Sequence, residues 1–202
     1  MAPISDALRR REGRDAEPSF ERLLRAAREL FATDGFAATP LDAVCAEAGV
    51  TKGSLYHHFG GKAELFEAVF EREAATLSAE VAEAALRRRD PWQVARAGIR
   101  GFLDASQDPG VQRIMLLDGL SVLGWERVRE IEAEYGLALI KTVIATLMDA
   151  GEIRRHDVDV LSHLLFGALV EGALLMARSD DAAAARRRVE REVRAVIEGL
   201  RT

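Results

Sequence analysis

The sequence contains a single cysteine, Cys45, among its 202 residues. One cysteine excludes a disulfide within the chain and any zinc site built from several thiolates, and it fits a reducing cytoplasm. No apolar stretch approaches the ~20 residues that cross a bilayer, and the N-terminus lacks the apolar core of a signal peptide. We therefore expect a soluble, unexported, cytoplasmic protein with no membrane partner.

Common enzyme motifs are also missing. The sequence has no Glu-x-x-His pair, no His-Glu-x-x-His and no nucleophile elbow. These motifs mark helical di-metal enzymes, metalloproteases and hydrolases respectively. We therefore expect no catalytic site, no metal site and no cofactor, and we keep a helical metal-dependent enzyme as an alternative.

Alternating β patterns and internal repeats are absent, and the start and stop signals along the chain are helical. Residues 1–18 contain arginines and two prolines without helical periodicity, which predicts a disordered tail. A first helix follows, with Ser19 as its N-cap, Gly35 as its stop and apolar residues at helical spacing between them. The fold class expected is all-α.

Two short helices are predicted next. Thr39 fits as an N-cap before a proline, and the helix that follows ends at Gly49. Thr51 then caps a third helix, in which Val50 and Leu55 have the spacing of a hydrophobic staple. Two helices joined by so tight a turn predict a helix-turn-helix.

Helical signals continue through the rest of the chain. A long helix runs up to the arginines at 87–89, and Asp-Pro and Pro-Gly pairs separate the next two helices. Gly124 is expected to interrupt the helical structure before a further helix, which ends at Gly151. Asp157 and the Asp180/Asp181 pair are the expected caps of the last two helices.

The stretch 50–66, VTKGSLYHHFGGKAELF, gathers polar and aromatic side chains. A phosphate-binding loop would need a glycine where Tyr56 stands and a hydroxyl residue where Ala63 stands. A metal site fails because the adjacent His57 and His58 project about 100° apart on a helix. A helix end presented to nucleic acid is the interpretation that is left.

The outward side chains of this stretch suit such a partner. Leu55 and Phe59 turn inward, while Thr51, Lys52 and Ser54 crowd the helix N-terminus, where backbone N–H groups and the helix dipole favour phosphate. The net charge of the chain is −5, but residues 1–62 balance nine Lys and Arg against nine Asp and Glu. The acidic excess therefore lies outside the region expected to meet nucleic acid.

The ordered run AGVTKGSLYHHFGGKAELF resembles the recognition region of tetracycline-repressor-type (TetR family) transcriptional regulators. The resemblance covers residues 20–66 and extends more weakly through the helical remainder. It implies a sequence-specific DNA-binding regulator, a repressor that a small-molecule effector releases from its operator. The domains it implies are a helix-turn-helix DNA-binding domain over 19–62 and an effector-binding and dimerisation domain over 63–202.

The resemblance also assigns roles to single residues. Lys52, Gly53 and Tyr56 would face bases. The rest of the expected DNA-binding set, mostly phosphate contacts, is Thr39, Thr51, Ser54, His57, His58 and Lys62.

A small-molecule pocket among the fifth to eighth helices is implied as well. Its candidate apolar lining is Phe70, Phe102, Met115, Trp125, Tyr135 and Phe166. Its candidate polar anchors are Gln112, Asp118, His163 and Glu171. Aromatic residues at helical spacing also suit a plain core, and both interpretations stay open.

One short recognition helix contacts only a few base pairs. We therefore expect a homodimer on a palindromic double-stranded DNA operator, with half-sites about 34–36 Å apart. The last two helices are the expected interface, since FGALVEGALLMA offers small residues for close helix crossing. A ligand-blind partner-binding module with a DNA-docking domain is the other alternative.

Overall fold

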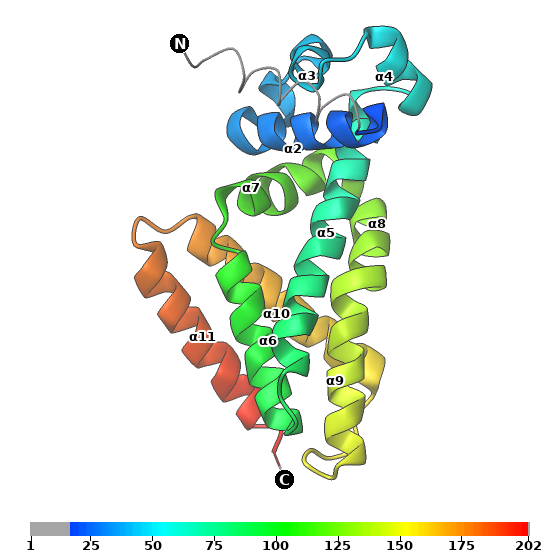
Figure 1. Cartoon of the computed structure of the whole chain (residues 1–202). Coiled ribbons are helices and arrows are strands. Elements are labelled where there is room, and N and C mark those ends of the chain that lie inside the picture. Colours follow the sequence, from blue (N-terminus) through cyan, green and yellow to red (C-terminus); the bar gives the residue numbers. More distant parts are fainter. Residues whose placement is uncertain (1–16, 202) are drawn as a thin grey trace, which may run out of the picture. The chain divides into compact units, whose positions relative to one another are not determined.

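The computed structural model describes residues 17–201, apart from the side chain of Leu86. The predicted tail of residues 1–18 therefore lies almost entirely outside the described residues. Within the described part the chain forms helices and no strand (Figure 1), with an isolated bridge between Ile153 and Arg201. The expected all-α class is confirmed.

The chain divides into two compact units, Met1–Val69 and Phe70–Thr202. The predicted domain boundary at residue 62 is the start of α5 (Lys62–Leu86), whereas the division falls inside this helix. The first turns of α5 belong to the first unit, because Phe66 is fully buried there with its ring 5.2 Å from that of Phe31. α5 is therefore one continuous helix shared by both units.

The first unit contains α2 (Ser19–Ala38), α3 (Leu41–Ala48) and α4 (Lys52–His58), together with the start of α5 (Figure 1). Each helix buries apolar side chains in a common core: Leu23, Leu24, Ala27, Phe31, Val44, Ala48 and Leu55. The chain turns between α3 and α4 at Gly49, whose φ of 64° is left-handed and costs glycine little. The predicted helix-turn-helix is thus formed by α3 and α4.

One predicted helix boundary in this unit is confirmed as an interruption, and another is wrong. Gly35 interrupts the first helix as predicted, because its φ of 81° and ψ of 166° are not helical, and helical residues resume beyond it as far as Ala38. The N-cap of α3 is Pro40 rather than Thr39. The Thr39 hydroxyl instead donates to the carbonyl oxygen of Gly35 at 2.8 Å, and it lies 3.3 Å from the carbonyl oxygen of Leu30. Thr39 therefore supplies a hydrogen-bond partner for the backbone at the kink.

The second unit continues α5 and adds further helical segments. Their bounds are α6 (Pro91–Ala105), α7 (Pro109–Val111), η1 (Gln112–Asp118), α8 (Gly119–Glu132), η2 (Ala133–Leu137), α9 (Ala138–Asp149), α10 (Val158–Ala177) and α11 (Ala182–Glu198). The predicted caps Asp157 and Asp181 are confirmed, and Asp90, from the predicted Asp-Pro start, caps α6 in the same way. The carboxylates of Asp90, Asp157 and Asp181 each accept a hydrogen bond from the backbone N–H three residues later, at 2.8, 3.1 and 2.8 Å.

α8 lies between two π-helical segments, η1 and η2, which the sequence did not predict. Gly124, the predicted break, has a φ of 79° and a ψ of 165°, so it interrupts the helical backbone within α8. π-helical turns are rare and occur frequently at functional sites. Both segments contribute residues to the cavity described below.

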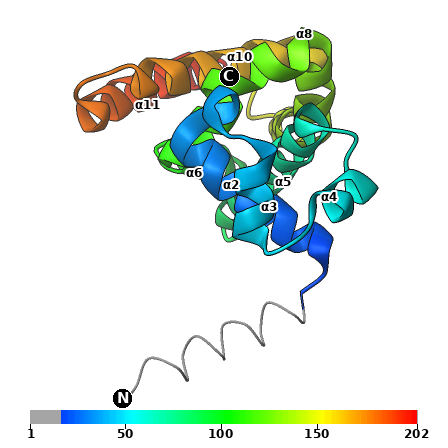
Figure 2. The same ribbon diagram turned by 90° about the horizontal axis from the view of Figure 1, so that it is seen from above.

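α10 and α11 pack side by side (Figures 1 and 2). They approach closely at Gly172, where an added Cβ would come within 2.5 Å of the Val189 side chain. The small residues of FGALVEGALLMA therefore serve packing within the chain at this position. Val160, Leu164 and Leu175 of α10 and Val196 of α11 stay exposed.

α10 alone among the described helices combines the length and the apolar composition of a membrane-spanning helix. It has 20 residues and a mean hydropathy of 1.8, enough by length and composition to cross a membrane, so the expectation that no stretch reaches such a length is wrong. In the second unit α10 packs against α6, α9 and α11 and buries Leu165, Phe166, Leu169 and Met176. The packing accounts for the buried apolar residues of α10, and the exposed ones form an apolar face.

Candidate functional site

α4 is held by its inner face and exposes its outer one. The Thr51 side chain caps the helix by accepting from the backbone N–H of Ser54 at 3.2 Å. Leu55 is fully buried, and Phe59, just after the helix, stacks on Phe20 with ring centroids 5.3 Å apart. On the opposite face Tyr56 is 58% exposed. The cap and the buried face of α4 therefore hold the helix in place, and its other side chains face solvent.

Lys52 makes an ion pair across the helix-turn-helix. Its Nζ lies 2.7 Å from Oδ1 of Asp42 in the first turn of α3. The hydrogen bond that Lys52 donates to Asp42, followed by the negative charge of Asp42, raises the pKa of Lys52. Both side chains are exposed. Asp42 thus holds the Lys52 ammonium beside α3 while leaving it accessible.

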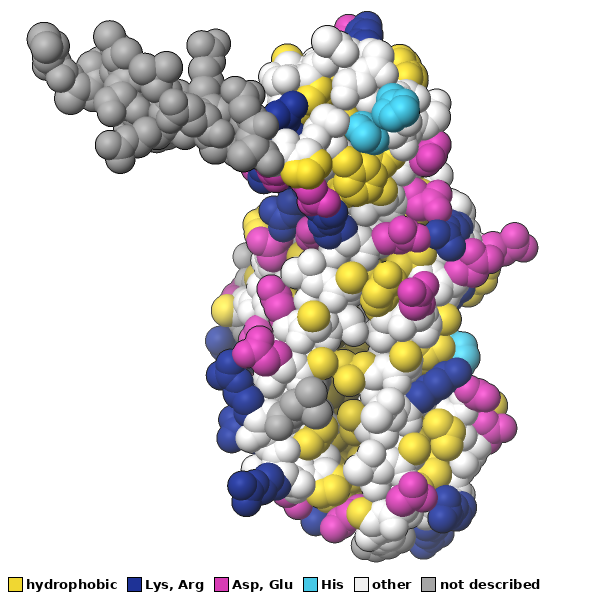
Figure 3. All heavy atoms as spheres, turned by 45° about the vertical axis from the view of Figure 1, so that its right-hand side comes forward, with side chains coloured by type: hydrophobic (Ala, Val, Ile, Leu, Met, Phe, Trp, Pro, Cys, Tyr) yellow, Lys and Arg dark blue, Asp and Glu magenta, His cyan; other side chains and the backbone are white. Residues whose placement is uncertain are grey.

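The paired histidines differ in their surroundings. His57 is exposed, and Figure 3 shows neighbouring histidine side chains on the surface of this unit. His58 is half-buried, its Nε2 lies 2.8 Å from Oγ of Ser19, and its ring meets the Phe20 ring edge-on at 5.8 Å. Ser19, predicted as an N-cap, is instead the first residue of α2 and bonds to His58. His58 therefore fastens α4 to α2.

Lys62 and Thr39 complete the predicted DNA-binding set. The Lys62 ammonium lies 4.5 Å from the centroid of the Phe36 ring and donates to the carbonyl oxygen of Ala37 at 3.3 Å. Thr39 is 1% exposed, and its hydroxyl is used inside the unit. The structure thus gathers the candidates of α4 and the start of α5 in one region and keeps the Thr39 side chain away from solvent.

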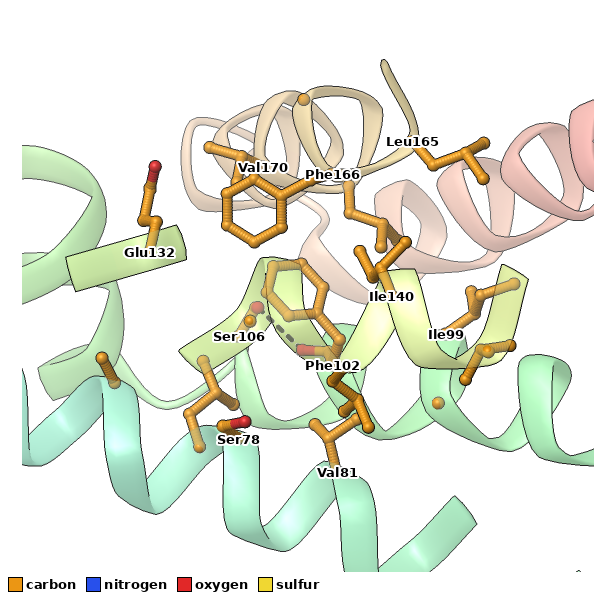
Figure 4. A pocket seen from close by; sticks show the side chains of 18 of the residues that line it. Ser78, Val81, Ile99, Phe102, Ser106, Glu132, Ile140, Leu165, Phe166 and Val170 are labelled. Atoms are coloured by element: carbon orange, nitrogen blue, oxygen red, sulfur yellow. Dashed lines mark hydrogen bonds between the residues drawn. The ribbon is translucent and has the colours of Figure 1, made fainter. Parts of the chain in front are cut away.

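A cavity of about 370 Å³ lies within the second unit. Most of its wall is apolar, and Figure 4 shows the rings of Phe102 and Phe166 facing each other across it. Figure 3 shows hydrophobic side chains gathered around a hollow on the surface of this unit. Six of the predicted lining residues border the cavity: Phe70, Phe102, Met115, Trp125, Phe166 and Glu171.

The structure places the other four candidates outside the lining: Gln112, Asp118, Tyr135 and His163. The Gln112 amide donates to the carbonyl oxygen of Ser106 at 2.8 Å. Asp118 pairs with Arg113 at 3.2 Å, and the exposed His163 bonds to a carbonyl oxygen one turn earlier in α10. The polar groups of Gln112, Asp118 and His163 thus have local partners in the fold.

Several polar lining residues were missed by the sequence analysis: Ser78, Ser106, Arg129 and Glu132. Arg129 Nη1 lies 2.7 Å from Oε2 of Glu132, and its guanidinium lies 4.2 Å from the centroid of the Trp125 ring. Burial raises the pKa of the Glu132 carboxyl, and Arg129 acts in the opposite direction. In the sequence these two residues stand in a charged run that is typical of a solvated helix face.

The first unit is a helix-turn-helix module with one exposed helix, and the second is a helical unit with an apolar cavity. Together they define the class of ligand-responsive, DNA-binding regulators. The chain belongs to the TetR family of bacterial regulatory proteins. Residues 23–69 match the family model described as "Bacterial regulatory proteins, tetR family", and residues 92–200 match "Tetracyclin repressor-like, C-terminal domain".

Curated and solved relatives agree with this assignment. The chain is 26% identical to the Tn10 TetC protein of Escherichia coli over 149 residues, which are 74% of this chain and 75% of that protein. It is 27% identical to the transcriptional regulator SrpR of Pseudomonas putida over 81% of this chain and 79% of the relative. A TetR-family regulator from Pectobacterium atrosepticum superposes with a TM-score of 0.78 at 29% identity, with 95% of each chain covered. The protein is a helix-turn-helix transcriptional regulator.

Proposed function

We propose that the protein represses transcription from a palindromic operator that it binds as a homodimer, and that a small molecule in the cavity releases it. The observation that carries this proposal is the outer face of α4. Tyr56 is 58% exposed on a short helix whose inner face is fully buried. A large aromatic side chain held this way contributes nothing to the core, and its ring and hydroxyl can meet a base edge or a phosphate.

The contacts to DNA divide by function. Lys52, Gly53 and Tyr56 read base edges in the major groove, and Lys52 leaves Asp42 to do so. Phosphate contacts fix the register, and they come from Thr51, Ser54, His57 and Lys62. Thr39 and His58 act from within the unit, because their polar groups already bond to Gly35 and Ser19.

The dimer interface is the exposed apolar face of α10 and α11. Leu164 is 66% exposed, and Val160, Leu175 and Val196 are also exposed. Apolar side chains exposed at helical spacing on two adjacent helices suit a second copy of the same face, because a two-fold interface pairs identical patches. Dimerisation presents two copies of α4 to successive major grooves on one side of the duplex.

Effector release acts through α5. Phe70, Leu77 and Val81 of this helix border the cavity, and the same continuous helix contributes Phe66 to the core of the first unit. A ligand that shifts α5 changes the separation of the two copies of α4. The protein performs no catalysis in this scheme, and it acts in the cytoplasm, where the operator is.

Genome-wide mapping of bound sites, with and without metabolite extracts, tests this function. The wild-type protein is expected at a few discrete sites that share a palindrome, and an active extract should remove it from them. Tyr56→Ala is the matched control, because it removes the exposed ring without touching the buried face of α4. Equal, site-independent recovery of wild type and Tyr56→Ala would contradict the proposal.

A further inference from the structure

We propose that the effector is a lipophilic amine, a compound with an apolar body and one protonated nitrogen that pairs with Glu132. This inference rests on the proposed function, since it takes the cavity as the effector site. It adds the chemical class of the ligand, which the family assignment leaves open.

The size and the apolar lining of the cavity determine which ligand body fits. At about 370 Å³ the cavity is at the small end of the usual range for ligand pockets. Figure 4 shows the Phe102 and Phe166 rings facing each other, with the aliphatic Ile99, Ile140 and Leu165 toward one side. Burying an aromatic or alicyclic group against such a wall is favourable, and the wall offers no hydrogen bonds to a carbon skeleton.

Polar side chains also border the cavity. In Figure 4 Glu132 lies beside Val170, far from Ile99 and Leu165, whereas Ser78 lies beside Val81. The Ser106 hydroxyl donates to the carbonyl oxygen of Phe102 at 2.7 Å, so its oxygen is left as an acceptor. The largely apolar wall therefore carries a few groups that accept hydrogen bonds, which suits an amphipathic ligand.

The charged groups of the wall sum to one negative charge, because Glu132 and Glu171 face a single cation, Arg129. Arg129 is committed on two sides, to Glu132 at 2.7 Å and to the Trp125 ring at 4.2 Å. A cationic ligand makes the wall neutral, whereas an anionic ligand doubles the imbalance. Charge therefore selects a cation.

Glu132 is the carboxylate that a cation would meet. Its side chain is 15% exposed, and Arg129 bonds to its Oε2. A carboxylate accepts several hydrogen bonds, and within the described residues Oε1 accepts none. A protonated amine from the cavity can donate to this oxygen without displacing Arg129.

Anionic and neutral ligands fit the same groups less well. A carboxylate could reach Arg129 only by displacing Glu132, and this would leave the mostly buried Glu132 carboxylate without its partner, which is costly. An alcohol can donate to Glu132 but carries no charge, so its hydrogen bond is weaker than that of an ammonium group. The order of affinity expected for one carbon skeleton is amine, then alcohol, then carboxylate.

Isothermal titration calorimetry of the full-length protein tests this order with three matched probes. 4-Phenylbutylamine, 4-phenylbutanol and 4-phenylbutanoate share one apolar body and differ in the head group. The amine is expected to bind about tenfold or more tightly than the alcohol, since a hydrogen bond to a charged group is worth more than a neutral one. Equal binding of amine and alcohol, tighter binding of the carboxylate, or no binding of any probe would overturn the proposal.

Two variants tie the preference to one carboxylate. Glu132→Gln keeps the size of the side chain and removes its charge, so amine affinity should fall to the level of the alcohol while alcohol affinity stays unchanged. Glu126→Gln makes the same charge change on an exposed side chain of α8 that does not border the cavity, and it should change neither. Equal losses for amine and alcohol in Glu132→Gln would mean that the wall is damaged and would count against the assignment.

This assay contains no DNA, so its failure is distinct from failure of the proposed function. Amine binding without any bound operator would contradict the regulator scheme and leave the ligand class standing. Operator binding without amine preference would do the reverse.

Discussion

Replacing Thr39 with valine separates a structural role from a DNA contact. The Thr39 side chain is 1% exposed, and its hydroxyl donates to the carbonyl oxygen of Gly35 at the kink of α2. Valine has nearly the same shape, so Thr39→Val creates no cavity and removes only the hydrogen bond. The buried carbonyl loses its partner, which costs about 1–3 kcal/mol.

Urea unfolding followed by circular dichroism at 222 nm measures this change. A loss of about 1–3 kcal/mol is a large part of the ~5–15 kcal/mol that stabilises a typical domain, so the midpoint should shift visibly at unchanged slope. Thr39→Ser keeps the hydroxyl and is the control, with a smaller shift. Operator affinity of folded Thr39→Val, measured by fluorescence anisotropy well below its melting temperature, should equal that of wild type.

The opposite pattern would refute this reasoning. If Thr39→Val unfolds at the wild-type urea concentration but binds the operator at least tenfold more weakly, the hydroxyl contacts DNA directly. The burial of Thr39 in the free protein would then not describe the bound one.

Three further changes test other parts of the structure. Lys62→Ala should weaken binding to all DNA sequences about equally and lower the slope of log affinity against log salt by roughly one per subunit. Tyr56→Ala should lower the binding free energy on the operator by about 1–3 kcal/mol and relax the preference at one base pair of each half-site, and operator-variant titrations measure both changes. Cys45→Ser should leave the peroxide response of DNA binding unchanged, because burial raises the pKa of this thiol and keeps it unreactive. The same substitution should lower the free energy of unfolding by about 1–3 kcal/mol, because it buries a hydroxyl. Gly136→Ala should weaken amine binding without changing operator affinity, because the new methyl would lie 2.8 Å from the Phe166 ring and displace this part of the cavity wall, as calorimetry can show.

Each of these changes has a result that contradicts it. A shift in base preference for Lys62→Ala with only a salt effect for Tyr56→Ala would reverse their roles. Loss of peroxide sensitivity in Cys45→Ser would make the thiol a sensor. Gly167→Ala is the control for Gly136→Ala, since it also borders the cavity but has no atom within 4 Å of the added methyl, and equal losses in both would deny the steric cause.

The helices of this protein could be predicted from sequence because their signals are local. The caps at Asp90, Asp157 and Asp181 each depend on one side chain and a backbone N–H three residues later. Gly35 and Gly124 were predicted as interruptions, and both have a positive φ that breaks the helical backbone. A single glycine does not show that a new helical segment resumes directly after it, so this part of the fold was not predicted.

The polar side of the cavity could not be predicted in the same way. Arg129 and Glu132 stand three residues apart in a charged run, a spacing that also fits a solvated helix pair. Only the packing of α8 against its neighbours turns Glu132 toward the cavity and removes most of its contact with water. In contrast, Phe102 and Phe166 were expected from their size and apolar character, which core and cavity wall share.

Selection of bound sequences from random double-stranded DNA, with the purified full-length protein, tests the central claim most directly. The account predicts enrichment of an inverted repeat whose half-site centres lie about 10–10.5 base pairs apart or a multiple of this, the spacing at which two copies of α4 reach successive major grooves. Recovery of no preferred sequence, or of a single half-site without symmetry, would contradict it.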